Sequence, residues 1–204
     1  LNWAYNTDSY IIEDDYDSEF RYNSKPIPAV QSIDGKDRVI YLGTFSKTVA
    51  PSIRISYMVL PEKLLDIYNE KYTKFSSAVS MMEQNILTAF INEGHYERHL
   101  NRMRKLYGEK RTVLLSELGK LGDSIRINGE NAGHHLALRL GKGLDEEEMV
   151  RLALENGVKV YPISPYFINE VPAKYKSTVL LGYAELSEKK IIEGIGRIRE
   201  AWNI

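Results

Sequence analysis

The architecture expected for this chain follows from one segment, Val39-Ile40-Tyr41-Leu42-Gly43-Thr44-Phe45-Ser46-Lys47-Thr48-Val49-Ala50-Pro51-Ser52-Ile53-Arg54. Its first four residues are apolar and rich in β-branched and aromatic side chains, which predicts a buried strand. A glycine, several hydroxyl groups, one lysine and one arginine come next. This change of composition indicates site chemistry at a strand end, where open α/β sheets bind their ligands.

Lys47 has a specific chemical use in this setting. Its amine can form a Schiff base with the aldehyde of pyridoxal 5'-phosphate. Thr44, Ser46 and Arg54 offer hydrogen-bond donors and a positive charge to the phosphate of that cofactor. The alternative interpretation is a solvated lysine in a loop after a strand, and this segment alone leaves both open.

A second segment carries complementary groups. Tyr10-Ile11-Ile12 predicts a short strand, and Glu13-Asp14-Asp15-Tyr16 follows it directly. Pyridoxal chemistry needs a carboxylate against the pyridine nitrogen, because a protonated ring is a better electron sink, and a phenol near the ring oxygen tunes the Schiff base. Asp14 and Tyr16 are the candidates for these two groups. The alternative is a solvated acidic turn or a cation site.

The two segments are expected to meet. Ligands of parallel α/β sheets collect outside the carboxyl ends of the strands. Neighbouring strands that end at Asp14-x-Tyr16 and at Lys47 would therefore converge on one cofactor.

Four blocks of sequence carry a family resemblance. They are Ile12-Glu13-Asp14-Asp15-Tyr16-Asp17-Ser18-Glu19-Phe20-Arg21-Tyr22; Tyr41-Leu42-Gly43-Thr44-Phe45-Ser46-Lys47; Gln84, Ala89-Phe90-Ile91, Gly94 and Arg98-His99-Leu100-x-Arg102-Met103-Arg104-x-x-Tyr107; and Leu180-Leu181-Gly182-Tyr183-Ala184-Glu185-Leu186-Ser187. Together they resemble the aminotransferase-like domain of the MocR subfamily of GntR-type bacterial transcriptional regulators. The lysine block alone fits many aminotransferases, whereas the acidic block points to the regulator subfamily.

The resemblance implies an α/β fold, namely the C-terminal part of a fold-type-I pyridoxal-phosphate-dependent transferase. It implies that Lys47 is the catalytic residue that carries the cofactor as a Schiff base. It also implies the other cofactor contacts: Asp14 at the pyridine nitrogen, Tyr16 at the ring oxygen, and Thr44, Ser46 and Arg54 at the phosphate. No metal is expected.

Composition narrows the functional class. The chain has 204 residues and a formal net charge of −1, with 27 Lys and Arg against 28 Asp and Glu, so it lacks the basic balance of a nucleic-acid binder. It has no cysteine, which fits a reducing compartment. Neither a signal segment nor an apolar run long enough to span a membrane is present, so a cytoplasmic location is expected.

The start of the chain suggests a fragment. Leu1-Asn2-Trp3-Ala4-Tyr5 resembles the end of a helix before the first strand. The resemblance implies that a DNA-binding winged helix, a linker and the early part of the large domain precede it in the full-length protein. DNA would then be bound only through the domain absent here, and the full-length protein would be a homodimer.

Periodicity predicts two domains, residues 1–96 and 97–204. The first is the end of a large domain with a parallel or mixed sheet, and the second is a small α+β domain. Strands are expected at Ile55–Leu60, Ser124–Asn128, Gly133–Leu140, Val158–Tyr161 and Thr178–Ala184. Helices are expected at 62–75, 77–93, His95–Leu121, after Asp145 and after Ser187. Pro26, Pro28 and Gly35 predict a loop within 17–38.

Three further features have ordinary interpretations. Met81 and Met82 are expected to fill core space. The basic face of the helix from His95, which includes Arg98, Arg102 and Arg111, is expected to be solvated, with a dimer interface as the alternative for Arg98 or Arg102. His134 and His135 point to opposite faces of a strand and do not form a zinc pair, so one of them is expected to pack.

One departure from the family affects function. Aminotransferases usually grip the substrate carboxylate with a small-domain arginine, yet no arginine occurs between Arg151 and Arg197. Either another domain or a partner subunit supplies this arginine, or the ligand is not an ordinary amino acid. We favour a regulatory effector domain that responds to an amine, an amino acid or the cofactor itself. The alternative is a catalytically active class I/II aminotransferase in which Lys47 also moves the substrate proton.

Overall fold

The computed structural model describes residues 1–22, 27–141 and 143–204. The predicted loop over residues 17–38 therefore lies partly outside the described residues, and so does Pro26. The chain forms two compact units, Leu1–Glu19 with Lys25–Met103, and Phe20–Ser24 with Arg104–Ile204. The chain passes from the first unit to the second between Met103 and Arg104, within one long helix, α4 (His95–Gly119).

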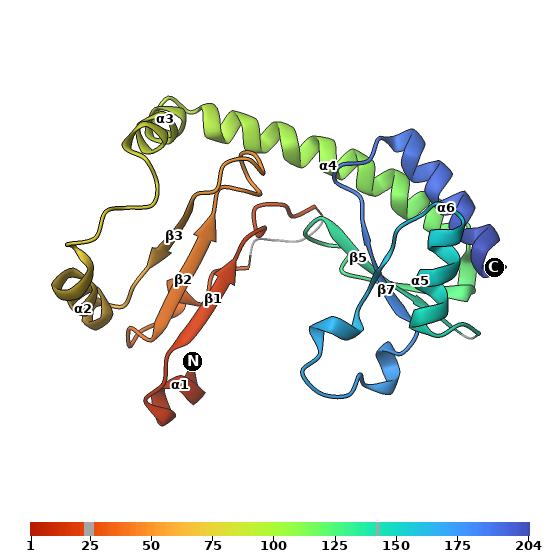
Figure 1. Cartoon of the computed structure of the whole chain (residues 1–204), viewed down its shortest axis with the longest axis horizontal. Helices are drawn as coiled ribbons and strands as arrows, with labels where there is room; N and C mark the ends of the chain where they lie inside the picture. The colour runs from red at the N-terminus through yellow and green to blue at the C-terminus, as the bar shows by residue number, and fades with distance from the viewer. Residues whose placement is uncertain (23–26, 142) are drawn as a thin grey trace. The chain divides into compact units, whose positions relative to one another are not determined.

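The first unit is built on a three-stranded mixed sheet with the order β1-β2-β3 (Figure 1). β1 (Ile11–Asp15) runs parallel to β2 (Val39–Thr44), and β3 (Ser56–Val59) is antiparallel to β2. A short helix, α1 (Asn2–Thr7), precedes the sheet, and the 3-10 turn η1 (Gln31–Ile33) precedes β2. The mixed sheet predicted for this part of the chain is confirmed.

Two helices follow the sheet. α2 (Glu62–Tyr72) begins directly after Pro61, a residue whose fixed φ suits a helix start. α3 (Met81–Asn92) begins four residues later than predicted, because Ser80 and Glu83 form a capping box that satisfies the first backbone donors. The Ser80 hydroxyl oxygen accepts from Glu83 N, and Glu83 Oε2 accepts from Ser80 N.

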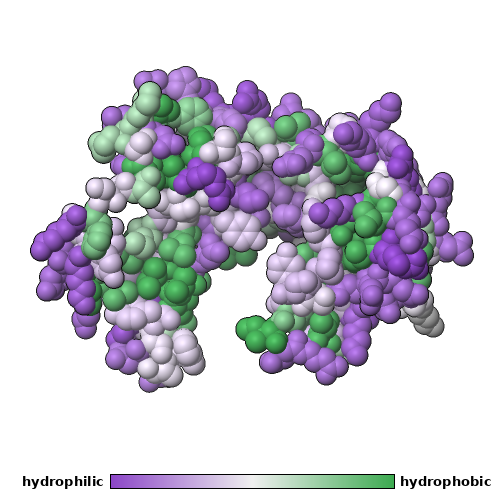
Figure 2. Space-filling view, viewed as in Figure 1, coloured by the Kyte–Doolittle hydropathy of each residue, from purple (hydrophilic) through white to green (hydrophobic). Residues whose placement is uncertain are grey.

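Apolar side chains of the first unit are largely exposed. The buried apolar residues among its described positions are Ala4, Val39, Pro61 and Leu100. Met81 and Met82, predicted to fill a core, are 68% and 73% exposed, so that prediction is wrong for this chain. Figure 2 shows apolar surface over the strands of this unit. The first unit therefore exposes apolar surface of the kind that usually contacts other protein segments.

The second unit contains a four-stranded antiparallel sheet with the order β4-β5-β7-β6 (Figure 1). Its strands and helices are α4 from Arg104, β4 (Ile125–Asn128), β5 (His135–Leu140), α5 (Glu146–Glu155), β6 (Tyr161–Pro162), β7 (Thr178–Gly182) and α6 (Glu188–Trp202). The 3-10 turns η2 (Gly122–Ser124), η3 (Ser164–Tyr166) and η4 (Ala173–Tyr175) connect them. This is the α+β arrangement expected for the small domain.

One hydrophobic core holds this unit together. Alternate residues of β5, Leu136, Leu138 and Leu140, are buried against α4, α5 and α6. Trp202 closes the core from the last turn of α6, and its indole Nε1 donates to Met149 O at 3.0 Å. Asp145 and Ser187 cap α5 and α6 through their side chains, as the sequence predicts.

The expected strand Val158–Tyr161 is mostly wrong. Only Tyr161 and Pro162 pair, with Leu180 and Val179 of β7. Glu146 of α5 fixes the residues that follow, because its carboxylate accepts from the backbone N of Ile163 and of Ser164. None of the helices in the described ranges is long and apolar enough to cross a lipid bilayer.

Candidate cofactor site in the first unit

The parallel register of β1 and β2 places Asp14 and Thr44 at one end of the sheet. Asp14 pairs with Leu42, and Asp15 pairs with Gly43. Because side chains alternate along a strand, Asp14 lies on the same face as Ile12, which is 66% exposed. Asp14 is exposed as well, and its carboxylate has no hydrogen-bond or ion-pair partner in the described part of the chain.

The acidic residues on either side of Asp14 have structural roles. Glu13 accepts from the backbone N of Val30 at 2.8 Å and of Gln31 at 2.9 Å, and so holds the start of η1. Asp15 accepts from the Ser18 hydroxyl at 2.8 Å and from the Tyr41 hydroxyl at 2.9 Å. Of the three consecutive acids, Asp14 is therefore the one that remains available to a ligand.

The segment after β2 is a compact hydrogen-bonded loop. Phe45 N donates to Ile55 O, and the Thr44 hydroxyl donates to the same carbonyl at 3.2 Å. The Ser46 hydroxyl donates to Ile53 O at 2.5 Å, and Ser46 N donates to the Thr44 hydroxyl oxygen. These bonds close the loop at its base, so that its polar groups lie beside the end of β2.

Arg54 joins this loop through Ser46. Its Nη1 donates to the Ser46 hydroxyl oxygen at 3.3 Å. The guanidinium is exposed and makes no ion pair with a described residue, so most of its donors stay available. Thr44 and Ser46, by contrast, direct their hydroxyl protons at backbone carbonyls, and Ser46 in this arrangement orients Arg54.

Lys47 is exposed at the turn that follows Ser46, with no ion-pair partner among the described residues. Its neighbour Thr48 is 1% exposed, and the Thr48 hydroxyl oxygen has no hydrogen-bond partner in the described part of the chain. Buried hydroxyls are nearly always hydrogen-bonded. The Thr48 hydroxyl, directly after Lys47, is an exception to this rule among the described residues.

Tyr16 follows β1 on the Asp14 face and is 46% exposed. The opposite face of the sheet holds two further tyrosines, Tyr41 and Tyr57, which the sequence pattern did not single out. A Cβ atom at Gly43 would lie 2.3 Å from Tyr57 Cζ, so the Tyr57 ring occupies the space over Gly43. Burial, followed by the hydrogen bond to Asp15, raises the pKa of Tyr41 above its usual range. A glycine inside a strand was the available signal for this close approach.

The available groups fit pyridoxal phosphate. Asp14, Lys47 and Arg54 are three charges without an ion-pair partner in the described residues. Their segments end or begin at the same end of the sheet, since Asp14 lies near the end of β1 and Thr44 pairs with Ser56, two residues after Arg54. A carboxylate, an amine and a guanidinium match the protonated ring, the aldehyde and the phosphate of this cofactor in chemistry. No set of three or more metal-ligating side chains occurs in residues 1–22, 27–141 and 143–204.

The second unit offers no arginine where a substrate carboxylate is expected. The segment from β6 through η3 carries Tyr161, Ser164 and Tyr166, and β7 is uncharged, with Thr178 as its one polar side chain. His134 is buried between Phe20 and Tyr107, with ring centroids 4.4 and 4.5 Å away, whereas His135 is exposed. The expectation that one of these histidines packs is confirmed.

The chain belongs to the family described as aminotransferase class I and II, whose model matches residues 6–198. It is 45% identical over 205 residues to the uncharacterized HTH-type transcriptional regulator YdeL of Bacillus subtilis, in a match that covers 100% of this chain and 44% of YdeL. It is 38% identical to the probable rhizopine catabolism regulatory protein MocR of Rhizobium meliloti, over 96% of this chain and 39% of MocR. The chain thus spans less than half the length of these regulators.

A solved enzyme structure is similar over the whole chain. LysN, the α-aminoadipate aminotransferase of Thermus thermophilus, complexed with N-(5'-phosphopyridoxyl)-L-leucine, superposes with a TM-score of 0.84 and 28% identity. The match covers 99% of this chain and 52% of LysN. The fold is therefore that of a fold-type-I aminotransferase.

Proposed function

We propose that this chain is the pyridoxal-phosphate-binding effector domain of a transcriptional regulator. The observation that carries the proposal is the arrangement of Asp14, Lys47 and Arg54, each without an ion-pair partner in the described residues, around the carboxyl ends of β1 and β2. The membership in the aminotransferase family supports the cofactor, and the similarity to YdeL and MocR supports the regulatory role.

Each residue has a proposed task. Lys47 would hold the cofactor covalently through its amine at this turn. Asp14 would pair with the ring nitrogen and favour its protonated form, and Tyr16 would contact the ring oxygen. Arg54 binds the phosphate, and the Thr44 and Ser46 hydroxyls join it after leaving the carbonyls of Ile55 and Ile53. The cofactor, when bound, supplies an electron sink for amine chemistry.

The absence of an arginine that could bind a substrate carboxylate favours a regulatory role over catalytic turnover. A planar arginine fork is the usual partner of a substrate carboxylate, and no arginine occurs between Arg151 and Arg197. We infer that the effector is an amine, an amino acid or the cofactor itself. DNA would be contacted through a part of the protein outside this chain, in a homodimer.

Cofactor binding can be tested on this chain directly. The measurement is the visible absorbance with added pyridoxal phosphate, followed by borohydride reduction and peptide mass spectrometry. The expected result is one modified lysine, Lys47, which is lost in Lys47→Ala and kept in Lys63→Ala, a matched exposed lysine on α2. Modification spread over several surface lysines would contradict the assigned site.

The regulatory role needs a separate assay. Full-length protein with bound cofactor should show no amino-donor-dependent consumption of a keto acid above the background of the Lys47→Ala protein. Its affinity for promoter DNA should change when an amine or the cofactor is added. Turnover at ordinary enzyme rates, about 1–1000 per second, would instead establish the aminotransferase alternative.

A further inference from the structure

The four-stranded sheet of the second unit has one face that the hydrophobic core does not use. Alternate residues of β5 and β7 point into the core, among them Leu136, Leu138, Val179 and Leu181. Residues directly opposite one another in antiparallel strands share a face, so the register places the intervening residues on the other side of the sheet. We call this side the Arg126 face; it carries Arg126, Asn128, His135, Ala137, Arg139 and Leu180.

Two arginines lie directly opposite each other on the Arg126 face. Arg126 of β4 pairs with Arg139 of β5 in the antiparallel register. Side chains in such a pair point the same way, with Cβ atoms about 4.5–5.5 Å apart, and like charges in this position destabilise the pairing. Arg126 is exposed and Arg139 is half-buried, and neither forms an ion pair or a hydrogen bond with a described residue. Both guanidinium groups therefore keep their donors available.

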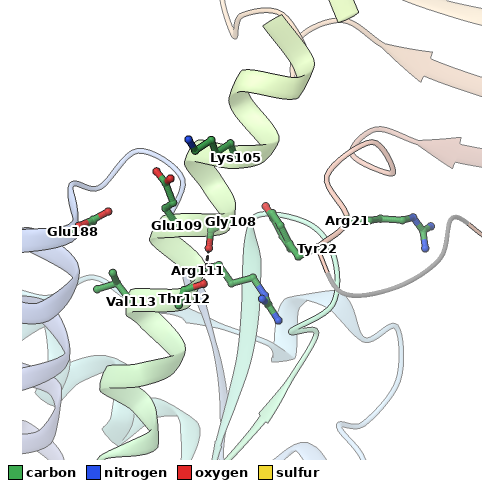
Figure 3. Close-up of a pocket in the computed structure, with 9 residues that line it drawn as sticks. All are labelled: Arg21, Tyr22, Lys105, Gly108, Glu109, Arg111, Thr112, Val113 and Glu188. Carbon is green, nitrogen blue, oxygen red and sulfur yellow. Dashed lines mark hydrogen bonds between the residues drawn. The ribbon is translucent and has the colours of Figure 1, made fainter. Parts of the chain in front are cut away.

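Other arginines of this unit have partners. Arg151 Nη1 lies 2.8 Å from Glu155 Oε1. Arg111 donates from Nε to Glu130 O, and its Cζ lies 5.2 Å from the centre of the Tyr22 ring, which is seen beside it in Figure 3. The pair on the Arg126 face, in contrast, combines two like charges in register with no ion-pair partner among the described residues.

The sheet itself supplies no opposite charge. Its four strands contain Arg126, Arg139 and His135, but neither Asp nor Glu. The chain as a whole is balanced, with 27 Lys and Arg against 28 Asp and Glu, so the excess of positive charge on this sheet is local. Adjacent positive groups without a paired acid attract an anion.

The neighbour of Arg139 on its other side takes none of its donors. Thr178 of β7 lies opposite Arg139. Thr178 is 1% exposed, and its hydroxyl oxygen has no hydrogen-bond partner in the described part of the chain. The donors of Arg139 therefore remain for a ligand shared with Arg126, whose strand β4 forms an edge of the sheet.

We propose that Arg126 and Arg139 together bind one phosphate group on the Arg126 face, as in inorganic phosphate or a small phosphate monoester. Each guanidinium presents two parallel N–H donors. A tetrahedral phosphate offers a pair of oxygens to each of two such forks, whereas a carboxylate offers one pair only. A bound dianion also replaces the repulsion between the two arginines with two attractive contacts. The site belongs to the second unit and does not depend on the proposed cofactor site.

The test uses the complete chain without pyridoxal phosphate and two-dimensional NMR of arginine Nε–H groups and backbone amides. The probes are inorganic phosphate, glycerol 1-phosphate and acetate, each up to about 10 mM at matched ionic strength. The expected result is a saturable shift of the Arg126 and Arg139 signals, with an apparent Kd for phosphate about tenfold or more below that for acetate.

The two phosphate probes distinguish the sources of the ligand. Equal affinity for both supports recognition of the phosphate group alone, and tighter binding of glycerol 1-phosphate supports a monoester whose organic part contacts the same face. Acetate binding as tight as phosphate binding would overturn the proposal.

Variants identify the side chains. Arg126→Gln and Arg139→Gln should each weaken phosphate binding about tenfold or more, whereas Arg199→Gln, at an exposed arginine on α6, should leave it unchanged. Arg126 is exposed, so its variant keeps the test valid if Arg139→Gln fails to fold. Its Tm without phosphate should equal or exceed that of the parent, because the repulsion is removed. Unchanged phosphate affinity in Arg126→Gln, or the same loss in Arg199→Gln, would contradict the assignment.

The Arg54→Gln protein separates this site from the proposed cofactor site. It should show the parent's phosphate-dependent shifts of Arg126 and Arg139, because Arg54 belongs to the first unit. Loss of these shifts in Arg54→Gln would mean that phosphate acts through the first unit, and this inference would be wrong. Loss of cofactor binding with the shifts retained supports both sites, and retention of both supports this site while removing Arg54 from the cofactor contacts.

Discussion

Exchanging the two neighbouring acids Asp14 and Asp15 for their amides should give opposite phenotypes. Asp14 is exposed and without a partner in the described part of the chain, so Asp14→Asn should change the free energy of unfolding by less than about 0.5 kcal/mol. It should weaken pyridoxal phosphate binding about ten- to a hundredfold, because the amide carries no charge for the protonated ring. Asp15→Asn should leave cofactor affinity nearly unchanged.

The cost of Asp15→Asn can be worked from its contacts. Asp15 accepts from Ser18 N, the Ser18 hydroxyl and the Tyr41 hydroxyl. A hydrogen bond to a charged group contributes about 1.5–3 kcal/mol when buried. The side chain is half-buried and the amide keeps one acceptor oxygen, so we expect a loss of about 1–2 kcal/mol. In a chain of this size that lowers Tm by about 2–8 °C.

The assays are thermal unfolding without cofactor and a cofactor titration by absorbance. A third readout is the ultraviolet titration of tyrosine, since burial and then the Asp15 hydrogen bond raise the pKa of Tyr41. Asp15→Asn should move that pKa down toward its usual range, and Asp14→Asn should not. Weaker cofactor binding in Asp15→Asn than in Asp14→Asn would refute the assignment of the two strand faces.

Three more changes test other parts of the fold. Leu138→Ala empties a fully buried position of β5 and should lower the free energy of unfolding by about 2–5 kcal/mol in urea titrations; a loss below about 1 kcal/mol would contradict the core described above. Ser80→Ala removes the capping box of α3 and should cost about 1 kcal/mol, whereas Ser52→Ala, at an exposed serine outside any helix, should cost almost nothing in the same titration. Burial alone would raise the pKa of Asp34, but hydrogen bonds from Tyr5 and from backbone N groups outweigh it and lower that pKa to about 2. The folded pKa is thus below the unfolded one, so the contribution of Asp34 is present above about pH 4 and is lost as the pH falls toward about 2; Asp34→Asn should flatten this part of the stability profile.

The sequence predicted most of the architecture because the relevant signals are local. The apolar run Val39–Leu42 became β2, Gly157 ended α5, and Ser187 capped α6. The parallel pairing of β1 with β2 also followed from the pattern, since two short apolar runs ended in polar groups that suit one ligand. Strand ends were less accurate, because β1 continues through its acidic residues to Asp15.

Long-range contacts could not be obtained from these patterns. The sequence does not show that Tyr57 lies over Gly43, or that the short strand β6 ends where Glu146 binds two backbone donors. Arg111 was assigned to a solvated basic face because its neighbours on α4 are charged. It is buried because Tyr22 and Glu130, far from it in sequence, lie against its guanidinium.

The segment at Phe20 has a consequence for dissecting this protein. Phe20 is fully buried, and its ring contacts Tyr107 and His134, so the second unit is assembled from two distant parts of the chain. Its backbone carbonyl also accepts from Gly133 N at 2.9 Å. A polypeptide starting at Arg104 would lack Phe20, so the rings of Tyr107 and His134 would face water. Its free energy of unfolding should fall by about 3–5 kcal/mol, as when a buried Phe is truncated. Excising this unit intact therefore requires a graft that carries residues 20–22, because one cut in the chain cannot release it whole.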